Sequence, residues 1–163
     1  MAGMKRRTVH VAGADIAVFC VNRDSPVESP ELIWAHGWGQ SHAALLPLAQ
    51  AMRRSARSTL LDLPGFDGAL PEPPGAWSTA DYADAAAEWL AGRDRVRRVW
   101  IGYSYGGRVG LQLAARHPEA LDGLCLIASP EGTGGFRFDG AESDGVPLAA
   151  VEMFPRGVVV GVK

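Results

Sequence analysis

The segment from Trp100 to Gly107 constrains this chain more than any other part of its sequence. It combines an apolar strand, a tight turn and the start of a helix, and it matches the pattern Gly-x-Ser-x-Gly around Ser104. A turn this sharp brings the flanking backbones together, so the residues two before and two after the serine must be small. Gly102 and Gly106 meet that condition. The pattern predicts that Ser104 has a strained backbone and that its hydroxyl stands above the edge of a sheet.

Apolar runs that alternate with helical patterns predict the rest of the fold. A hairpin is expected first, with its turn at 13–14, and several strands and helices follow. The strands are expected at 8–12, 15–21, 31–35, 57–63, 96–101 and 121–128, and the helices at 45–53, 79–91 and from Ser104 to near 117. From residue 31 onward the strands are apolar throughout, which is typical of a parallel sheet covered on both faces. The predicted fold class is α/β, a mostly parallel sheet with helices on both faces.

One predicted helix carries clear signals at both ends. Ser78 and Asp81 have the spacing of a capping box, and Trp77 and Tyr82 can form a hydrophobic staple around it. Gly92 is expected to end this helix.

Composition predicts a single globular domain and excludes several functions. The chain has 163 residues, of which 47% are hydrophobic, and a net charge of −2, which argues against a nucleic-acid or membrane-surface partner. No run reaches the roughly 18 apolar residues of a membrane span, and the basic residues near the start precede no such run, so we expect a cytoplasmic protein. Cys20 and Cys125 are expected to be buried thiols. No cofactor and no metal is implied.

Three loops that follow predicted strands carry the candidate chemistry, because ligands bind at the carboxyl ends of strands in such sheets. They contain His36-Gly37-Trp38-Gly39, Asp62-Leu63-Pro64-Gly65-Phe66 and the turn around Ser104. In this order the three motifs resemble those of the α/β-hydrolases, and the resemblance covers residues 8–128. The first motif and Arg116-His117-Pro118-Glu119-Ala120 look most like the small carboxylesterases of that family, which include the pimeloyl-carrier methyl ester esterases.

The resemblance implies roles for three residues. Ser104 would attack an acyl carbonyl, and the backbone N–H groups of Trp38 and Tyr105 would form the oxyanion hole. The substrate would be a small-molecule ester or similar acyl compound. His36 would hold its loop in shape, and Asp62 is expected to order its turn. The alternative is that the turn is only a close strand-to-helix crossing.

The sequence departs from the family where the catalytic base is expected. The family order is serine, acid, histidine, and the only histidine after Ser104 is His117. A helix between them would place His117 about 20 Å away, too far to act as the base. His10 and His42 lie in segments with no evident route to Ser104. Acids are available, and they are Glu131, Asp139, Glu142 and Asp144.

The pattern changes after residue 128. Residues 1–128 are interpreted as the N-terminal portion of an α/β-hydrolase domain, and 129–163 as a glycine-rich tail that does not match the family. We therefore expect a truncated domain that lacks the C-terminal strands. The strand at 121–128 would then lie at an edge, open to self-association, unless residues 158–162 add beside it. The rival hypothesis is a non-catalytic remnant, a binding module or one subunit of a heteromer.

Overall fold

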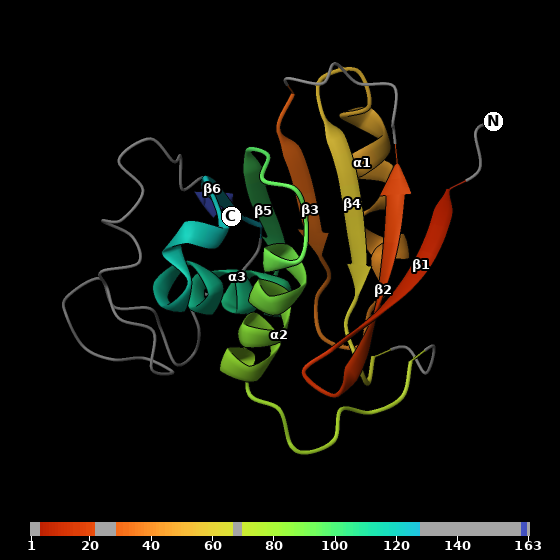
Figure 1. The fold of residues 1–163 in the computed structure, drawn as a ribbon. Coiled ribbons are helices and arrows are strands. Elements are labelled where there is room, and N and C mark those ends of the chain that lie inside the picture. The colour runs from red at the N-terminus through yellow and green to blue at the C-terminus, as the bar shows by residue number, and fades with distance from the viewer. Residues whose placement is uncertain (1–3, 22–28, 67–69, 128–160, 163) are drawn as a thin grey trace.

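A computed structural model describes residues 4–21, 29–66, 70–127 and 161–162 of the chain. The structure is built on a seven-stranded sheet with the order β1-β2-β4-β3-β5-β6-β7 (Figure 1). The strands are β1 (Lys5–Val11), β2 (Ala14–Val21), β3 (Glu31–Ala35), β4 (Arg57–Asp62), β5 (Arg98–Tyr103), β6 (Gly123–Ile127) and β7 (Gly161–Val162).

The sheet is mostly parallel, as the apolar strands predict. β3 pairs in parallel with β4 and β5, and β6 pairs in parallel with β5 and β7. The hairpin strands are antiparallel to each other, and β2 is antiparallel to β4. The parallel strands therefore all end at one edge of the sheet, where the three candidate loops emerge.

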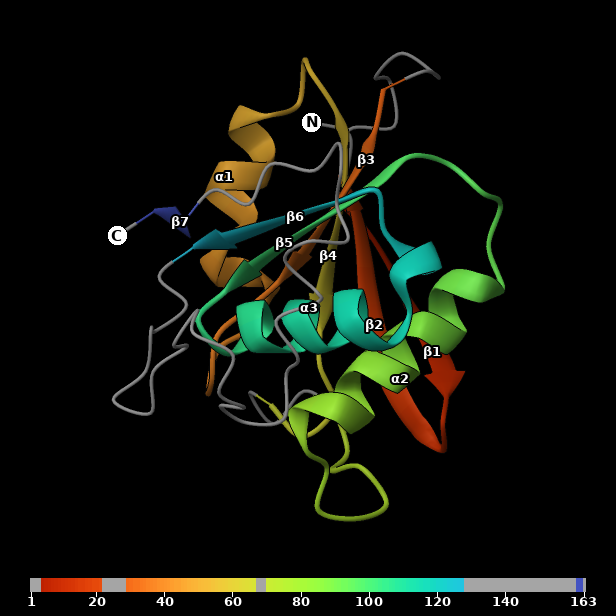
Figure 2. The same cartoon turned by 90° about the vertical axis from the view of Figure 1, so that its left-hand side faces the viewer.

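Helices cover both faces of the sheet (Figure 2). On one face lie α2 (Thr79–Ala91) and α3 (Tyr105–Arg116), which contribute to one core cluster that includes the fully buried Trp100. On the other face α1 (Leu46–Ala51) contributes Ala49 to a second cluster with Trp34 and Leu60. The predicted fold class is confirmed.

The largest differences from the predicted elements lie in the first half of the chain. The hairpin turn lies at Ala12 and Gly13, both with positive φ, one residue before its predicted place. The helix expected at 45–53 is shorter than predicted, because α1 covers only Leu46–Ala51, and a 3₁₀ turn, His42–Ala44, precedes it. Leu45 lies between the 3₁₀ turn and α1, has helical φ and ψ, and provides no side-chain cap. Helical backbone therefore begins earlier than the apolar pattern indicated.

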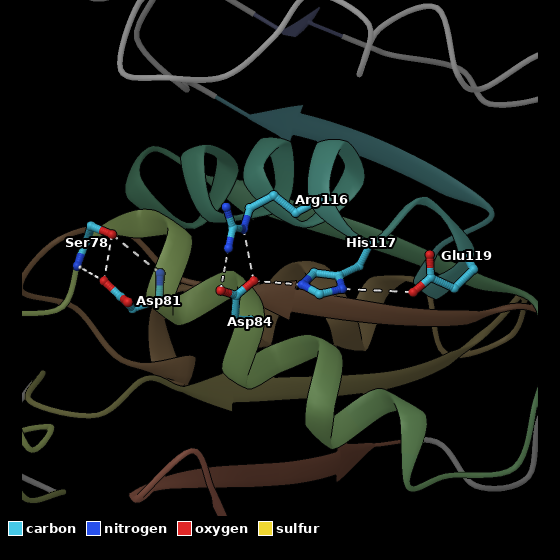
Figure 3. Close-up of polar contacts among 6 residues, drawn as sticks. All are labelled: Ser78, Asp81, Asp84, Arg116, His117 and Glu119. Carbon is cyan, nitrogen blue, oxygen red and sulfur yellow. Dashed lines mark hydrogen bonds and ion pairs between the residues drawn. The ribbon is translucent and has the colours of Figure 1, made fainter.

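The start of α2 is as predicted. Ser78 Oγ accepts from the Asp81 amide, and the Asp81 carboxylate accepts from the Ser78 amide at 2.7 Å (Figure 3). The Trp77 and Tyr82 rings meet edge to face at 5.1 Å between centroids, which completes the predicted staple. Gly92 follows the last residue of α2.

The predictions for the tail concern residues that lie largely outside the described ones. Gly161 and Val162 pair with Leu126 and Ile127, so part of the 158–162 segment adds beside β6 as one hypothesis expected. The domain boundary at 128 and self-association through this edge stay predictions. Among the described residues, no helix has the length and apolarity that crossing a bilayer requires.

Candidate active site

Ser104 lies at the junction of β5 and α3 with a strained backbone. Its φ of 49° and ψ of −111° fall outside the conformations that a residue with a side chain adopts readily. Its amide donates to the Ile127 carbonyl of β6 at 2.9 Å, and its carbonyl accepts from the Gly107 amide at 3.0 Å. The chain therefore turns directly from strand to helix at this serine, as the sequence pattern predicts.

The two flanking glycines are required by contact between backbones. A Cβ on Gly102 would overlap the backbone of Gly106 and Gly107, and a Cβ on Gly106 would overlap the carbonyl of Ala35. The Trp100 indole also donates to the Gly106 carbonyl at 2.9 Å. The first turn of α3 is thus held directly against β5 and the end of β3.

His36 joins the glycine loop to the loop that follows β4. Its side chain is fully buried, and its Nδ1 donates to the Gly37 carbonyl at 2.8 Å. Its Nε2 accepts from the Leu63 amide at 3.1 Å. Both ring nitrogens hold the backbone of the two loops, which is the shaping role that the sequence predicts for His36.

Gln40 supports the same loop, and the sequence reasoning missed it. Its Oε1 accepts from the Gly37 amide at 3.1 Å, and its own amide donates to the Gly37 carbonyl at 3.2 Å. These two bonds close a tight turn around Trp38, so the Trp38 backbone is fixed from both sides.

An aromatic cluster brings the three loops together. Trp38 meets Phe66 and Tyr105 edge to face, at 5.1 and 5.2 Å between ring centroids. Phe66 also contacts Tyr105 and Tyr82. Trp38 is 72% exposed, whereas Phe66 and Tyr82 are buried. The cluster gives the carboxyl edge of the sheet an apolar surface next to Ser104. The sequence analysis included Phe66 in the second candidate loop but predicted none of its ring contacts.

Burial changes the ionisation of the tyrosines in this cluster. It raises the pKa of Tyr82 to about 12, and the Tyr82 hydroxyl donates to the Pro64 carbonyl at 2.9 Å. Burial also raises the pKa of Tyr105. Both phenols are therefore neutral near pH 7 and provide apolar ring surface, not charge.

Asp62 binds a turn earlier in the chain, whereas the sequence predicts that it orders its own turn. Its buried carboxylate accepts from the His42 amide at 2.6 Å and from His42 Nδ1 at 3.0 Å. The His42 ring stacks on Phe19 of β2 at 3.6 Å between centroids. This pair fastens the 3₁₀ turn to β4.

His117 is held at the far end of α3 from Ser104. Its Nε2 donates to Asp84 of α2 at 2.7 Å, and Arg116 binds the same carboxylate at 2.6 Å (Figure 3). Twelve helical residues separate it from the turn, about 18 Å along the axis. His117 thus joins α3 to α2, and the prediction that it cannot be the base agrees with this position.

Comparisons with known proteins are consistent with this geometry. A family model described as the alpha/beta hydrolase fold matches residues 30–142. The pimeloyl-[acyl-carrier protein] methyl ester esterase of Shewanella sp. (strain MR-7) is 35% identical over 106 residues, which cover 65% of this chain and 37% of that protein. The same esterase of Aeromonas hydrophila is 33% identical, covering 63% and 39%. The chain thus spans less than half the length of these relatives.

Solved structures give a similar result. A membrane phospholipase A matches with a TM-score of 0.66 and 30% identity, covering 77% of this chain and 40% of that one. An N-acyl homoserine lactonase matches with a TM-score of 0.64 and 27% identity, covering 76% and 44%.

Proposed function

We propose that this chain, which belongs to the alpha/beta hydrolase fold family, hydrolyses carboxylic esters or similar acyl bonds with Ser104 as the nucleophile. The observation that carries the proposal is the strained turn at Ser104, at the carboxyl edge of the sheet and next to the glycine loop. In this position a serine hydroxyl can approach a substrate carbonyl that lies above the sheet.

The backbone around Ser104 suits the charge that develops in such a reaction. Tyr105 is the first residue of α3, and the N–H group of a first helical residue has no acceptor within its helix. The helix dipole also favours negative charge at this end. We assign the oxyanion hole to the amides of Tyr105 and Trp38. Each such donor is worth about 3–4 kcal/mol of barrier in characterised enzymes.

The proposed reaction follows from these groups. The Ser104 oxygen bonds to the acyl carbon, and the carbonyl oxygen gains the negative charge. When the carbonyl re-forms, the bond between the acyl carbon and the alkoxy oxygen breaks, and the alcohol leaves with the proton that the Ser104 hydroxyl gave up. Water then releases the acid from the acyl-serine. The aromatic cluster of Trp38, Phe66 and Tyr105 favours an ester with an apolar group. The two curated relatives named above are esterases of a pimeloyl-[acyl-carrier protein] methyl ester, which supports an ester of a carboxylic acid as the substrate class. We place this reaction in the cytoplasm, where two free cysteines are expected to stay reduced.

A non-catalytic role is the second candidate, and the histidines favour it. Both ring nitrogens of His36 bind backbone, while His42, His117 and His10 pair with Asp62, Asp84 and Asp15. A serine without a general base is a weak nucleophile. In that case the same surface would bind an ester without cleaving it.

Two measurements separate these functions. The wild-type chain should hydrolyse a short-chain nitrophenyl ester, and a fluorophosphonate should label Ser104 as mapped by mass spectrometry. Ser104→Ala should lose both, while Ser55→Ala, at an exposed turn, should retain them. Equal hydrolysis by wild type and Ser104→Ala would contradict the assignment of the nucleophile and favour the non-catalytic role.

A further inference from the structure

Two backbone N–H groups at the carboxyl edge of the sheet have no acceptor in the part of the chain that the structure describes. They belong to Trp38, in the glycine loop, and to Tyr105, the first residue of α3. Two open donors can bind the same oxygen only if each is held in a fixed direction. The helix fixes the Tyr105 amide, whereas the Trp38 amide lies in a loop and depends on other contacts for its direction.

The direction of the Trp38 N–H group is set by the carbonyl of Gly37. The two groups belong to one planar trans peptide unit, so they point in opposite directions and turn together. The Gly37 carbonyl accepts two hydrogen bonds, from His36 Nδ1 at 2.8 Å and from the Gln40 amide at 3.2 Å. This peptide unit is therefore held at its carbonyl end, and its N–H end stays open.

Residues 37–40 form a type II β-turn that begins at a glycine. The bond from the Gln40 amide to the Gly37 carbonyl closes the turn, and Gly39 has the positive φ, 67°, that this turn type requires at its third position. Gly37, the first residue, carries no side chain and so has wide backbone freedom. Rotation at Gly37 would turn the peptide unit that carries the Trp38 N–H group.

The Gln40 side chain restrains this glycine. Its Oε1 accepts from the Gly37 amide at 3.1 Å, so Gln40 binds both the peptide unit before Gly37 and the one after it. A Cβ on Gly37 would lie 2.9 Å from Gln40 Oε1 and 3.0 Å from the Tyr103 ring, so the carboxamide and that ring pack directly against the glycine. With both peptide units held, the φ and ψ angles of Gly37 are fixed.

We propose that Gln40 is a positioning residue of the oxyanion hole, which acts through Gly37 to hold the Trp38 N–H group in its productive direction. This role presupposes the nucleophile proposed for Ser104, and Gln40 itself touches no reacting atom. Preorganised donors lower a barrier because they need no reorientation when the charge develops. Without the side-chain bond, the peptide unit rotates about Gly37, and the Trp38 and Tyr105 amides no longer converge on one oxygen.

Acetate tests the two amides without any catalysis, because one of its oxygens can accept from both. In the wild-type chain, acetate should shift the Trp38 and Tyr105 amide resonances along one saturating curve, as followed by nuclear magnetic resonance. Gln40→Met removes Oε1 and keeps the length of the side chain. It should raise the dissociation constant of acetate about tenfold. The shift at Trp38 should be largely lost, while that at Tyr105 is kept.

Gln50→Met is the matched control, since it makes the same substitution at an exposed position of α1. It should bind acetate as the wild-type chain does. An unchanged acetate response of the Trp38 amide in Gln40→Met would overturn the role of Gln40. A wild-type chain in which acetate leaves the Trp38 amide unshifted would overturn it as well, because that amide would not face the shared oxygen.

Hydrolysis of a nitrophenyl ester gives a second measurement. Gln40→Met should lower kcat about tenfold and leave KM unchanged, because the lost interaction is made only in the transition state. A variant that is merely less stable keeps both constants when it is assayed well below its unfolding temperature. A raised KM with unchanged kcat would contradict the assignment. If the wild-type chain neither hydrolyses the ester nor is labelled at Ser104, the proposed function fails, whereas the acetate titration still decides whether Gln40 directs the Trp38 amide.

Discussion

The backbone of Ser104 illustrates how much a local pattern can determine. A non-glycine residue with this φ and ψ costs about 1–3 kcal/mol, which its surroundings must offset. The Ser104 amide is bound to Ile127, and the adjacent backbones touch at Gly102 and Gly106. The sequence could predict this turn because the serine and both glycines lie within five consecutive residues.

Gly102→Ala tests the backbone contact in this turn. The added Cβ would overlap the backbone of Gly106 and Gly107, which cannot move like the end of a flexible side chain. We expect a loss of about 1–3 kcal/mol in the free energy of unfolding, measured by urea denaturation. Gly75→Ala is the control, because nothing lies within 4 Å of its Cβ position. A loss no larger than that of the control would show that the turn is looser than described.

His36→Ala tests the connection between the glycine loop and the loop after β4. The change leaves the buried Leu63 amide without its acceptor, which costs about 1–3 kcal/mol of folding free energy. His10→Ala is a suitable control, since the His10 ring is exposed and binds Asp15 on the neighbouring strand. The midpoint of thermal unfolding would be measured for both variants and for the wild-type chain. Equal midpoints for the two variants would argue against a role for His36 in holding the loops.

Other contacts of the candidate site could not be predicted because the residues that make them are distant in sequence. Phe66 and Tyr82 meet Trp38 and Tyr105 only after four separate segments assemble. The thiols were expected to be buried, but Cys20 and Cys125 are only half-buried. Cys20 lines two cavities near the edge of the sheet where the parallel strands begin, which the apolar run around it gave no reason to expect.

At the scale of elements, α2 was predicted closely and α1 was not. The bounds of α2 follow from Ser78, Asp81 and Gly92, which are local signals. α1 has six residues, a proline in its first turn and no side-chain cap, so its sequence carried little information on where it begins. The turn before α1 is held by a distant residue, Asp62 at the end of β4, whose carboxylate accepts from the His42 amide 20 residues earlier in the chain.

Ser78→Ala tests the start of α2. The change removes the hydroxyl that accepts from the Asp81 amide and donates to its carboxylate. We expect a loss of about 1 kcal/mol in the free energy of unfolding by urea, as for other N-cap serines. Ser78→Asp should recover part of this loss by capping the same amide. A variant as stable as wild type would indicate that the hydrophobic staple alone fixes the helix start.

At the scale of the whole molecule, strand order decides what lies together. The row Arg57–Glu31–Arg98 exists only because β3 lies between β4 and β5, and these residues belong to three distant segments. The sequence predicts strands and their apolar faces, but it does not give their order or register. The sequence therefore could not predict the two cavities near the edge where the parallel strands begin. It could predict the site at the edge where they end, because loop motifs follow those strands.

Acid should destabilise the whole molecule through carboxylates with lowered pKa values. The hydrogen bond from Arg116 lowers the pKa of Asp84 below its ordinary value of 3.8, and that from Ser78 lowers the pKa of Asp81. Groups whose pKa is lower in the folded state contribute stability above the unfolded value. That stability is lost as the pH falls through the folded pKa.

The urea midpoint should therefore fall as the pH is lowered from about 5 to about 3. Asp84→Asn should make this dependence less steep, and added salt should weaken the contribution of Asp84, since its side chain is 40% exposed. A midpoint that rises toward pH 3 would contradict the sign assigned to these shifts.

The hydrogen bond from the Ser104 amide to the Ile127 carbonyl links the turn at residue 104 directly to β6, which lies between β5 and β7. A change in the pairing between Ile127 and Val162 is therefore expected to alter the hydrogen bond that the Ser104 amide donates. The solvent-exchange rate of the Ser104 amide proton, measured by nuclear magnetic resonance, would thus report a change in pairing at β6. The signal would arise at residue 104 itself, without a label or an altered side chain.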